Sequence, residues 1–335
     1  MHTGNGNGHF PTEVLSQELQ ELTPEPRAPR WRWPWRRRPR NFSKRRSLAI
    51  AIVLFAVTVV STLAVGAQFA LAYATSQVPA FDDFFSAYFT ILRNPHALAA
   101  GLPFAATLLG ILLAHELGHY FTCRYYGIAA TYPYFIPAPT LIGTLGAFIV
   151  IRSPIVNRRA LFDVGLAGPV AGFLLIVPAM ALAVLHSKIV PGLEAGSAIV
   201  FGEPLLLRIL LALLRPGVHA GDLLLHPVGR AAWVGLFATA LNLLPGGQLD
   251  GGHILYSVAR ESHRRVTYFL AIALVPLAFF WWGWLLWTVL LLALGSRHPL
   301  LLDPQHGLDN KRRAWAVVGL AIFVLSFMPV PLIIR

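Results

Sequence analysis

The sequence predicts an all-α polytopic membrane protein with about seven transmembrane helices and one small β-hairpin at the membrane edge, between the second and third spans. Three observations support this prediction. Of the 335 residues, 56% are hydrophobic and only 13% are charged. Long apolar runs recur along the chain, and Arg and Lys gather at alternate ends of these runs. Apolar runs of about 20 residues cross a bilayer, and the Arg and Lys asymmetry sets their direction. An ordinary soluble enzyme is excluded.

The formal net charge of +12 does not indicate a nucleic-acid partner. Much of this charge lies in one N-terminal run and at the ends of apolar segments, where orientation in the membrane explains it. The single cysteine, Cys123, excludes an intramolecular disulfide framework and a Cys-rich zinc module. Any metal must therefore be held by His and carboxylate side chains.

Residues 1–46 are expected to form a disordered, basic cytoplasmic tail, because they contain few apolar residues and many Pro and Gly. Residues 31–38 combine three Trp with four Arg, which is typical of an anchor at the lipid headgroups. Residues 47–97 comprise the first span, 47–73, and an outer loop. Arg and Lys ahead of this span place the N-terminus in the cytoplasm.

Residues 98–260 are expected to form the membrane core. The second span, 98–125, runs inward, and the prolines and β-branched residues of 132–154 predict a hairpin covered by protein. The third span, 160–186, carries Gly and Ala at spacings that let another helix or a substrate approach closely. An outer loop, 187–230, includes an interfacial helix at 204–214.

The fourth span begins near Ala231 and is expected to unwind at Pro245, Gly246 and Gly247, because these residues break helices. Residues 261–335 are expected to hold the C-terminal transmembrane helices. The apolar run 266–295 predicts two short helices rather than one. A polar cytoplasmic loop, 296–313, then leads to the last span, 314–334, and to a C-terminus on the outer side.

His115, Glu116 and His119 spell H-E-x-x-H within the second span. Histidines four apart on a helix point to one side, as a zinc ion needs, and Glu116 lies near enough to take a proton from water. A carboxylate at the centre of a lipid-facing helix costs roughly 2.5–3.5 kcal/mol. A metal site inside the bundle explains the presence of these groups.

Zinc needs a third protein ligand and an open position. Asp250 is the acidic residue of another span at matching depth, whereas His253 and His263 lie nearer the cytoplasmic surface. Asn242 precedes Asp250 by eight residues, which is about 12 Å in a continuous helix. The unwinding between them is expected to bring both to one centre.

These motifs resemble the site-2 protease family of intramembrane zinc metalloproteases. The resemblance rests on residues 115–119 together with Asn242, Pro245 and the pair Asp250-Gly251. The stretches 133–139, 143–147 and 163–169 are similar to the branch that contains the chloroplast EGY-type members and their bacterial relatives. The resemblance covers roughly residues 98–260.

The resemblance implies an M50-type endopeptidase that holds one Zn²⁺ and cleaves peptide bonds within transmembrane segments. It implies His115, His119 and Asp250 as zinc ligands, Glu116 as general base and acid, and Asn242 as a stabiliser of the oxyanion.

The resemblance also implies a strand that pairs with an unwound substrate, made of Gly143, Thr144, Leu145, Gly146 and Ala147. One departure is the outer loop, which has no room for the PDZ domain of some bacterial members. The expected partners are single-pass membrane proteins and lipids, without nucleic acid, in a bacterial inner membrane.

Two other classes remain open at this point. A metal or proton-coupled transporter also places His and Asp in its spans, but it needs polar residues along a whole path, and the outer halves of these helices are apolar. An inactive zinc-binding scaffold needs no Glu116, yet Glu116 is present.

Overall fold

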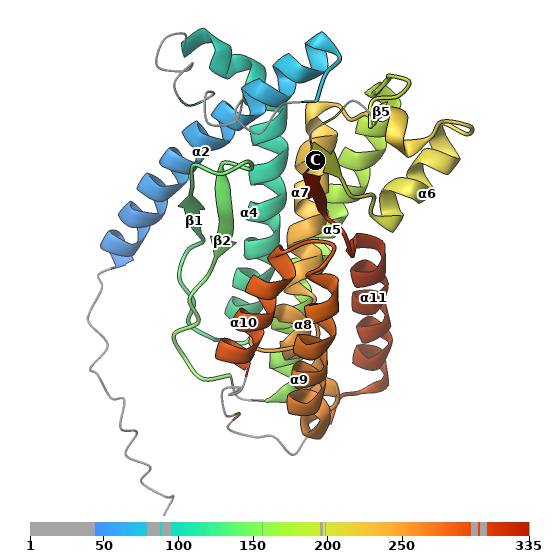
Figure 1. Cartoon of the computed structure of the whole chain (residues 1–335). Coiled ribbons are helices and arrows are strands. Elements are labelled where there is room, and N and C mark those ends of the chain that lie inside the picture. Colours follow the sequence, from blue (N-terminus) through green and yellow to red (C-terminus); the bar gives the residue numbers. More distant parts are fainter. Residues whose placement is uncertain are drawn as a thin grey trace, which may run out of the picture. The chain divides into compact units, whose positions relative to one another are not determined.

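The computed structural model describes residues 44–78, 88, 95–155, 157–194, 197, 199–295, 301 and 307–334 (Figure 1). Its helices are α2 (Lys44–Thr75), η1 (Pro95–Gly101), α4 (Leu102–Tyr125), α5 (Arg158–His186), α6 (Leu205–Leu214), η2 (Ala220–Asp222), α7 (Pro227–Asn242), α8 (Asp250–Val258), α9 (Arg260–Leu277), α10 (Gly283–Gly295) and α11 (Asn310–Ser326). Its strands are β1 (Tyr134–Pro137), β2 (Thr144–Phe148), β3 (Lys188–Ile189), β4 (Ile199–Phe201), β5 (Leu223–Leu224) and β6 (Leu332–Ile334).

Three helices in the described part of the chain are long and apolar enough to cross a membrane. They are Arg45–Thr75, His96–Tyr125 and Arg158–His186, and they correspond to the first three predicted spans. The prediction of a mostly helical membrane protein is confirmed at this level. Residues 1–43 of the predicted tail, most of the loop 74–97 and much of the loop 296–313 lie outside the described residues.

The predicted interruption of the fourth span is confirmed. Helix α7 ends at Asn242 and α8 begins at Asp250, and between them Gly247 adopts a φ of 62°. This left-handed conformation suits glycine, which has no Cβ to clash with the backbone. The chain can therefore turn sharply between the two helices, whereas a continuous helix would carry Asp250 about 12 Å away from Asn242.

The run 266–295 forms two helices, as predicted. Helix α9 ends at Leu277, directly after Pro276, and α10 begins at Gly283. Leu274 of α9 and Leu291 of α10 join one apolar cluster, which Leu244 of the interrupted segment also enters. The pair α9 and α10 therefore packs on the segment that carries the helix break.

The prediction for the end of the chain is wrong. The last helix, α11, stops at Ser326 instead of continuing to residue 334, and Leu332–Ile334 forms β6, which pairs antiparallel with β4. Pro329 and Pro331 end the helix, because proline lacks the N–H that the next turn requires. Hydropathy alone does not separate an apolar strand from an apolar helix.

The predicted hairpin is confirmed as an antiparallel pair of β1 and β2, in which Phe135 lies opposite Ala147. It is one of three two-stranded sheets in the described part of the chain, so the single hairpin of the prediction was incomplete. The other two sheets, β3 with β5 and β4 with β6, involve the stretch predicted as an outer loop. Figure 1 shows the β1–β2 hairpin between α2 and α4.

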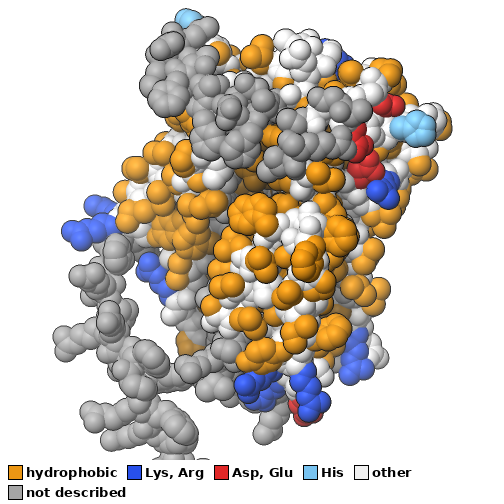
Figure 2. Space-filling view, in the orientation of Figure 1, with side chains coloured by type: hydrophobic (Ala, Val, Ile, Leu, Met, Phe, Trp, Pro, Cys, Tyr) orange, Lys and Arg blue, Asp and Glu red, His pale blue; other side chains and the backbone are white. Residues whose placement is uncertain are grey.

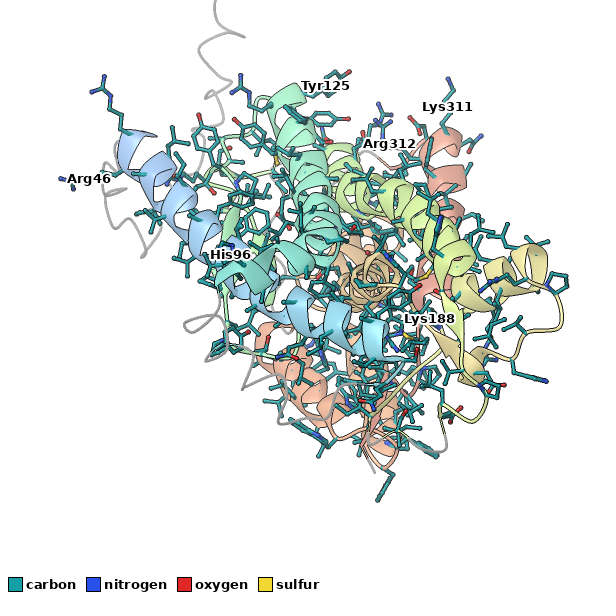
Figure 3. The ribbon with its side chains drawn as sticks, turned by 90° about the horizontal axis from the view of Figure 1, so that it is seen from above. Arg46, His96, Tyr125, Lys188, Lys311 and Arg312 are labelled. Carbon is teal, nitrogen blue, oxygen red and sulfur yellow. The ribbon has the colours of Figure 1, made fainter. Side chains whose placement is uncertain are left out.

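Helices α4, α5 and α7 pack on one another and form the centre of the bundle. Two of these helices approach closely at Gly118 of α4, where an added Cβ would lie 2.5 Å from the carbonyl oxygen of Ala167 on α5. Helix α11 contacts α5 and α7, while α2 contacts α4. In Figure 3, Arg46 of α2 and Lys311 of α11 accordingly lie on opposite sides of the bundle.

A polar clamp, defined as Arg312, Asp163 and Tyr126, joins the start of α11 to α5 and to the end of α4. Arg312 donates from Nε to Oδ1 of Asp163 at 2.9 Å and from Nη2 to Oδ2 at 2.6 Å. The Tyr126 hydroxyl donates to the same carboxylate. Burial and the neighbouring Asp163 raise the pKa of Tyr126.

In Figure 2, Lys and Arg gather at the lower end and hydrophobic side chains cover the surface above.

Candidate metal centre

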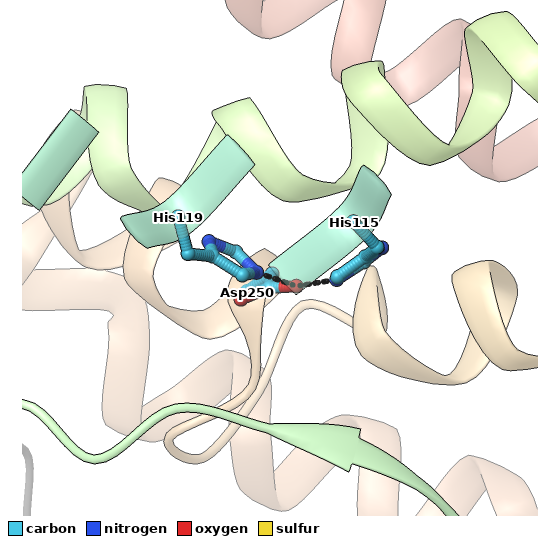
Figure 4. Close-up of side chains that lie close together, drawn as sticks. All are labelled: His115, His119 and Asp250. Atoms are coloured by element: carbon cyan, nitrogen blue, oxygen red, sulfur yellow. Dashed lines mark hydrogen bonds and ion pairs between the residues drawn. The ribbon is translucent and has the colours of Figure 1, made fainter. Parts of the chain in front are cut away.

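Two buried histidines and a partly buried aspartate, from two helices, meet in the bundle. His115 and His119 lie four residues apart on α4, so both rings point to one face, and Asp250 is the first residue of α8. The Oδ2 atom of Asp250 lies 3.1 Å from Nε2 of His115 and 3.3 Å from Nε2 of His119 (Figure 4). The structure thus brings together the three residues that the sequence singled out as metal ligands.

The donor set and its spacing fit a tetrahedral zinc ion. The three donor atoms lie within 4.8 Å of one another. Ligands at about 2.0–2.1 Å from a tetrahedral zinc lie about 3.3 Å apart, close to the two measured separations. Nδ1 of His119 donates a hydrogen bond to the carbonyl oxygen of Val164 at 2.7 Å. This bond fixes the tautomer in which Nε2 is free to bind a metal.

Glu116 is buried beside the two histidines, and the backbone of Ile149 lies close enough to interact with its carboxylate. Ile149 directly follows β2. The end of the hairpin therefore reaches the one carboxylate of this centre that is not a candidate ligand. Glu116 therefore adds a second carboxylate beside the three candidate ligands.

Asn242, the last residue of α7, also reaches the centre. Its Nδ2 atom lies 3.5 Å from Nε2 of His115, which is too long for a strong hydrogen bond. Asn242 and Asp250, which flank the helix break, therefore both lie near Nε2 of His115. The side-chain amide of Asn242 thus lies beside the metal donors without a strong hydrogen bond to them.

Glycines on one face of α5 make room for the histidine rings. A Cβ at Gly168 would lie 2.2 Å from Nε2 of His119, and one at Gly172 would lie 3.4 Å from Nδ1 of His115. A Cβ at Gly165 would lie 3.2 Å from the carbonyl oxygen of Asp250. The small residues of the third span therefore accommodate the metal centre as well as close helix packing.

Two side chains of α9 hold the loop that precedes Asp250. Nε2 of His263 donates to the carbonyl oxygen of Gly247 at 3.1 Å, and the N–H of Gly247 donates to Oγ1 of Thr267 at 3.3 Å. The backbone N–H and the carbonyl oxygen of Gly247 are thus both hydrogen-bonded. Helix α9 therefore positions the loop, and through it Asp250.

The predicted substrate-binding stretch lies in and beside β2. Gly143 precedes the strand, and Thr144, Leu145, Gly146 and Ala147 belong to it. Thr144 is buried and donates to the carbonyl oxygen of Ile136, whereas the Leu145 side chain is 69% exposed. The strand pairs only with β1 in the described residues, so it has a second edge without a strand partner.

Sequence reasoning missed several residues that support this centre. The carbonyl of Val164 carries no side-chain signal, and His263 appeared too close to the surface to matter. The spacing of Gly165, Gly168 and Gly172 was a usable signal, because positions three, four and seven apart share one helix face. That pattern alone did not distinguish contact with a ring from contact with another backbone.

Comparison with known proteins gives consistent matches. Residues 103–281 match the model of peptidase family M50. The probable zinc metalloprotease EGY1, chloroplastic, of Arabidopsis thaliana is 31% identical over 306 residues, which cover 84% of this chain and 53% of that protein. The probable zinc metalloprotease EGY2, chloroplastic, of the same plant is 32% identical over 263 residues, covering 76% of this chain and 46% of that protein.

The probable zinc metalloprotease EGY1, chloroplastic, of Oryza sativa subsp. japonica is 32% identical over 224 residues, which cover 62% of this chain and 37% of that protein. The chain thus spans about half or less of the length of these curated relatives. No solved structure matches the chain.

Proposed function

Because this chain belongs to peptidase family M50, we propose that it is a zinc metalloprotease that hydrolyses peptide bonds within the transmembrane segments of membrane-protein substrates. The observation that carries the proposal is the meeting of His115, His119 and Asp250, with donor atoms within 4.8 Å of one another, beside a buried Glu116. Relatives named as zinc metalloproteases support the choice of metal.

The two histidines and Asp250 hold the metal, and the hydrogen bond from His119 to Val164 keeps one ring in its binding tautomer. Zinc, when bound, polarises the scissile carbonyl and makes a water molecule more acidic. Glu116 takes the proton of that water and delivers it to the leaving amine. The Asn242 amide lies beside His115, from where its N–H can donate to the oxyanion.

The substrate is proposed to bind as an extended strand against β2. A peptide bond within a helix is shielded, and its carbonyl is already hydrogen-bonded, so a substrate span must open locally before it can react. The edge of β2 without a strand partner offers backbone groups to such a segment. The contact between Ile149 and Glu116 supports this placement, because it links the end of the strand to the proton-handling residue.

The proposed topology has seven spans, with the N-terminus in the cytoplasm and the C-terminus outside, in a bacterial inner membrane. Helices α7 with α8, α9, α10 and α11 supply the spans beyond the three long apolar helices. The distribution of Arg and Lys in the sequence supports this orientation. The metal centre then lies in the cytoplasmic half, and single-pass substrates are cut there, near Gly, Pro or Asn.

Substitution of the proton-handling residue tests the proposal most directly. Purified Glu116→Gln should retain one zinc per chain and lose cleavage of a transmembrane peptide by about 10²–10⁴-fold, because only the proton transfer is removed. His119→Ala should lose both zinc and cleavage. Equal zinc loss in the two variants would contradict the roles assigned here. Zinc binding by a wild-type protein without any cleavage would favour the inactive scaffold.

A further inference from the structure

A cavity of about 320 Å³ lies at the end of α7 opposite to Asn242. Arg230 and Asn242 are twelve residues apart on this helix, or about 18 Å. The volume falls within the range of small-molecule sites. Most of the lining residues have apolar side chains and come from β4, α6, β5, α7 and the C-terminal segment, while backbone and charged groups leave nearly half of the wall polar. The apolar residues include Leu207, Leu223, Leu225, Trp233, Met328 and Ile333.

Arg230 contributes a buried positive charge to this cavity. Its side chain belongs to a residue that is only 7% exposed, and its guanidinium lies 4.1 Å from the centre of the Phe201 ring. No residue in the described part of the chain forms a hydrogen bond or an ion pair with this guanidinium. Burial of an uncompensated charge is costly. Its position in the first turn of α7 adds to that cost, because the helix dipole there is positive.

The other polar side chains that line the cavity have partners. Nε1 of Trp233 donates to the carbonyl oxygen of Gly202 at 2.6 Å, and Oε2 of Glu203 accepts from Nε of Arg208 at 3.0 Å. The Phe201 ring covers one face of the Arg230 guanidinium and leaves its N–H edge for acceptors in the plane. Arg230 is therefore the group through which this cavity recognises a ligand.

We propose that the cavity binds a small monocarboxylate with an apolar body. The guanidinium edge matches the two oxygens of a carboxylate, and the apolar wall accommodates the rest of the molecule. Glu194 and Glu203 also line the cavity. Their negative charges repel a doubly charged anion such as phosphate more strongly than a singly charged carboxylate. A free short-chain acid and a fatty acid from the bilayer share this chemistry.

Binding is tested with hexanoate on the purified full chain in detergent, by equilibrium dialysis and by thermal unfolding. Hexanoate should bind and raise the unfolding temperature. Hexanol and hexylamine, which have the same apolar body, should not, and phosphate should bind more weakly. Equal binding of hexanol would show that the apolar wall alone attracts the ligand and would overturn the proposal.

Arg230→Met separates a ligand-binding role from a structural one. This variant should weaken hexanoate binding about tenfold or more, because a charge-assisted hydrogen bond is lost. Without ligand it should unfold at the same or a higher temperature, because an uncompensated buried charge is removed. A lower unfolding temperature without ligand would show that Arg230 is part of the scaffold, and undiminished binding would place the carboxylate elsewhere.

Arg208→Met is the matched control, because Arg208 also lines the cavity but is exposed and paired with Glu203. Hexanoate affinity should change little in this variant, and a loss as large as that of Arg230→Met would overturn the assignment to Arg230.

The source of the ligand is decided by comparing hexanoate with oleate supplied in vesicles. Tighter binding of oleate identifies the bilayer, and tighter binding of hexanoate identifies the aqueous phase. Binding of neither overturns the proposal.

Discussion

Gly168 is the position where a single methyl group would disturb the metal centre. A Cβ there would lie 2.2 Å from Nε2 of His119, much closer than any non-bonded contact allows. The ring cannot turn away easily, because its Nδ1 is hydrogen-bonded to Val164. The glycine and the hydrogen bond together keep Nε2 directed at Asp250.

Gly168→Ala is therefore expected to lower zinc affinity about 10–100-fold, the range found when groups that orient metal ligands are altered. Competition with a chromophoric chelator would measure this change. Gly110→Ala is the control, because Gly110 also lies within a helix but has nothing within 4 Å of an added Cβ. It should bind zinc normally and gain up to about 1 kcal/mol of helix stability. Normal affinity in Gly168→Ala would mean that α5 moves aside freely.

At the scale of elements, helix α11 is attached to the bundle through the polar clamp at its N-terminal end. Arg312 is about three-quarters buried and bonds both oxygens of Asp163. Arg312→Ala should lower the free energy of unfolding by about 1.5–3 kcal/mol, because Asp163 would lose a charged partner. Thermal unfolding in detergent would measure the loss. Arg313→Ala, at an exposed neighbouring position, should change the free energy of unfolding little. Equal losses of stability in the two variants would contradict a stabilising role of the polar clamp.

Strand β2 is the element on which substrate binding is proposed to depend. Proline at Leu145 or Phe148 removes a backbone N–H and should raise the KM for a transmembrane peptide, or stop cleavage, while zinc stays bound. Leu145→Ala removes the side chain but keeps the N–H, and it should retain most of the activity. Steady-state kinetics with zinc analysis would distinguish these outcomes. Unchanged kinetics in both proline variants would show that the hairpin has a structural role and does not bind the substrate backbone.

At the scale of the whole molecule, the proposed orientation can be tested with single cysteines. The native Cys123 is fully buried, so its replacement by Ala leaves a background without thiols. Cysteines at Ser153 and Ser262 should react with membrane-impermeant reagents from the cytoplasmic side only, and one at Ala198 from the outer side only. This follows from the distribution of Arg and Lys. Labelling of a cysteine at position 262 from the outer side would contradict the proposed topology.

The sequence by itself determined the helical membrane class and the residue types of the centre. Apolar runs reveal themselves by composition, and the spacing in H-E-x-x-H places two histidines on one helix face whatever surrounds that helix. The break before Asp250 was also predictable, because Pro and Gly act on the local backbone. These signals are local, so they survive without knowledge of the fold.

Tertiary structure alone decided which distant groups meet. The carbonyl of Val164 orients His119, the glycines of α5 admit the rings, and His263 holds Gly247. The pairing of β6 with β4, which encloses the cavity around Arg230, likewise joins segments far apart in the chain. Backbone carbonyls and small residues carry no chemical signature of their partners. Only the packing of helices and strands against one another gives them their role.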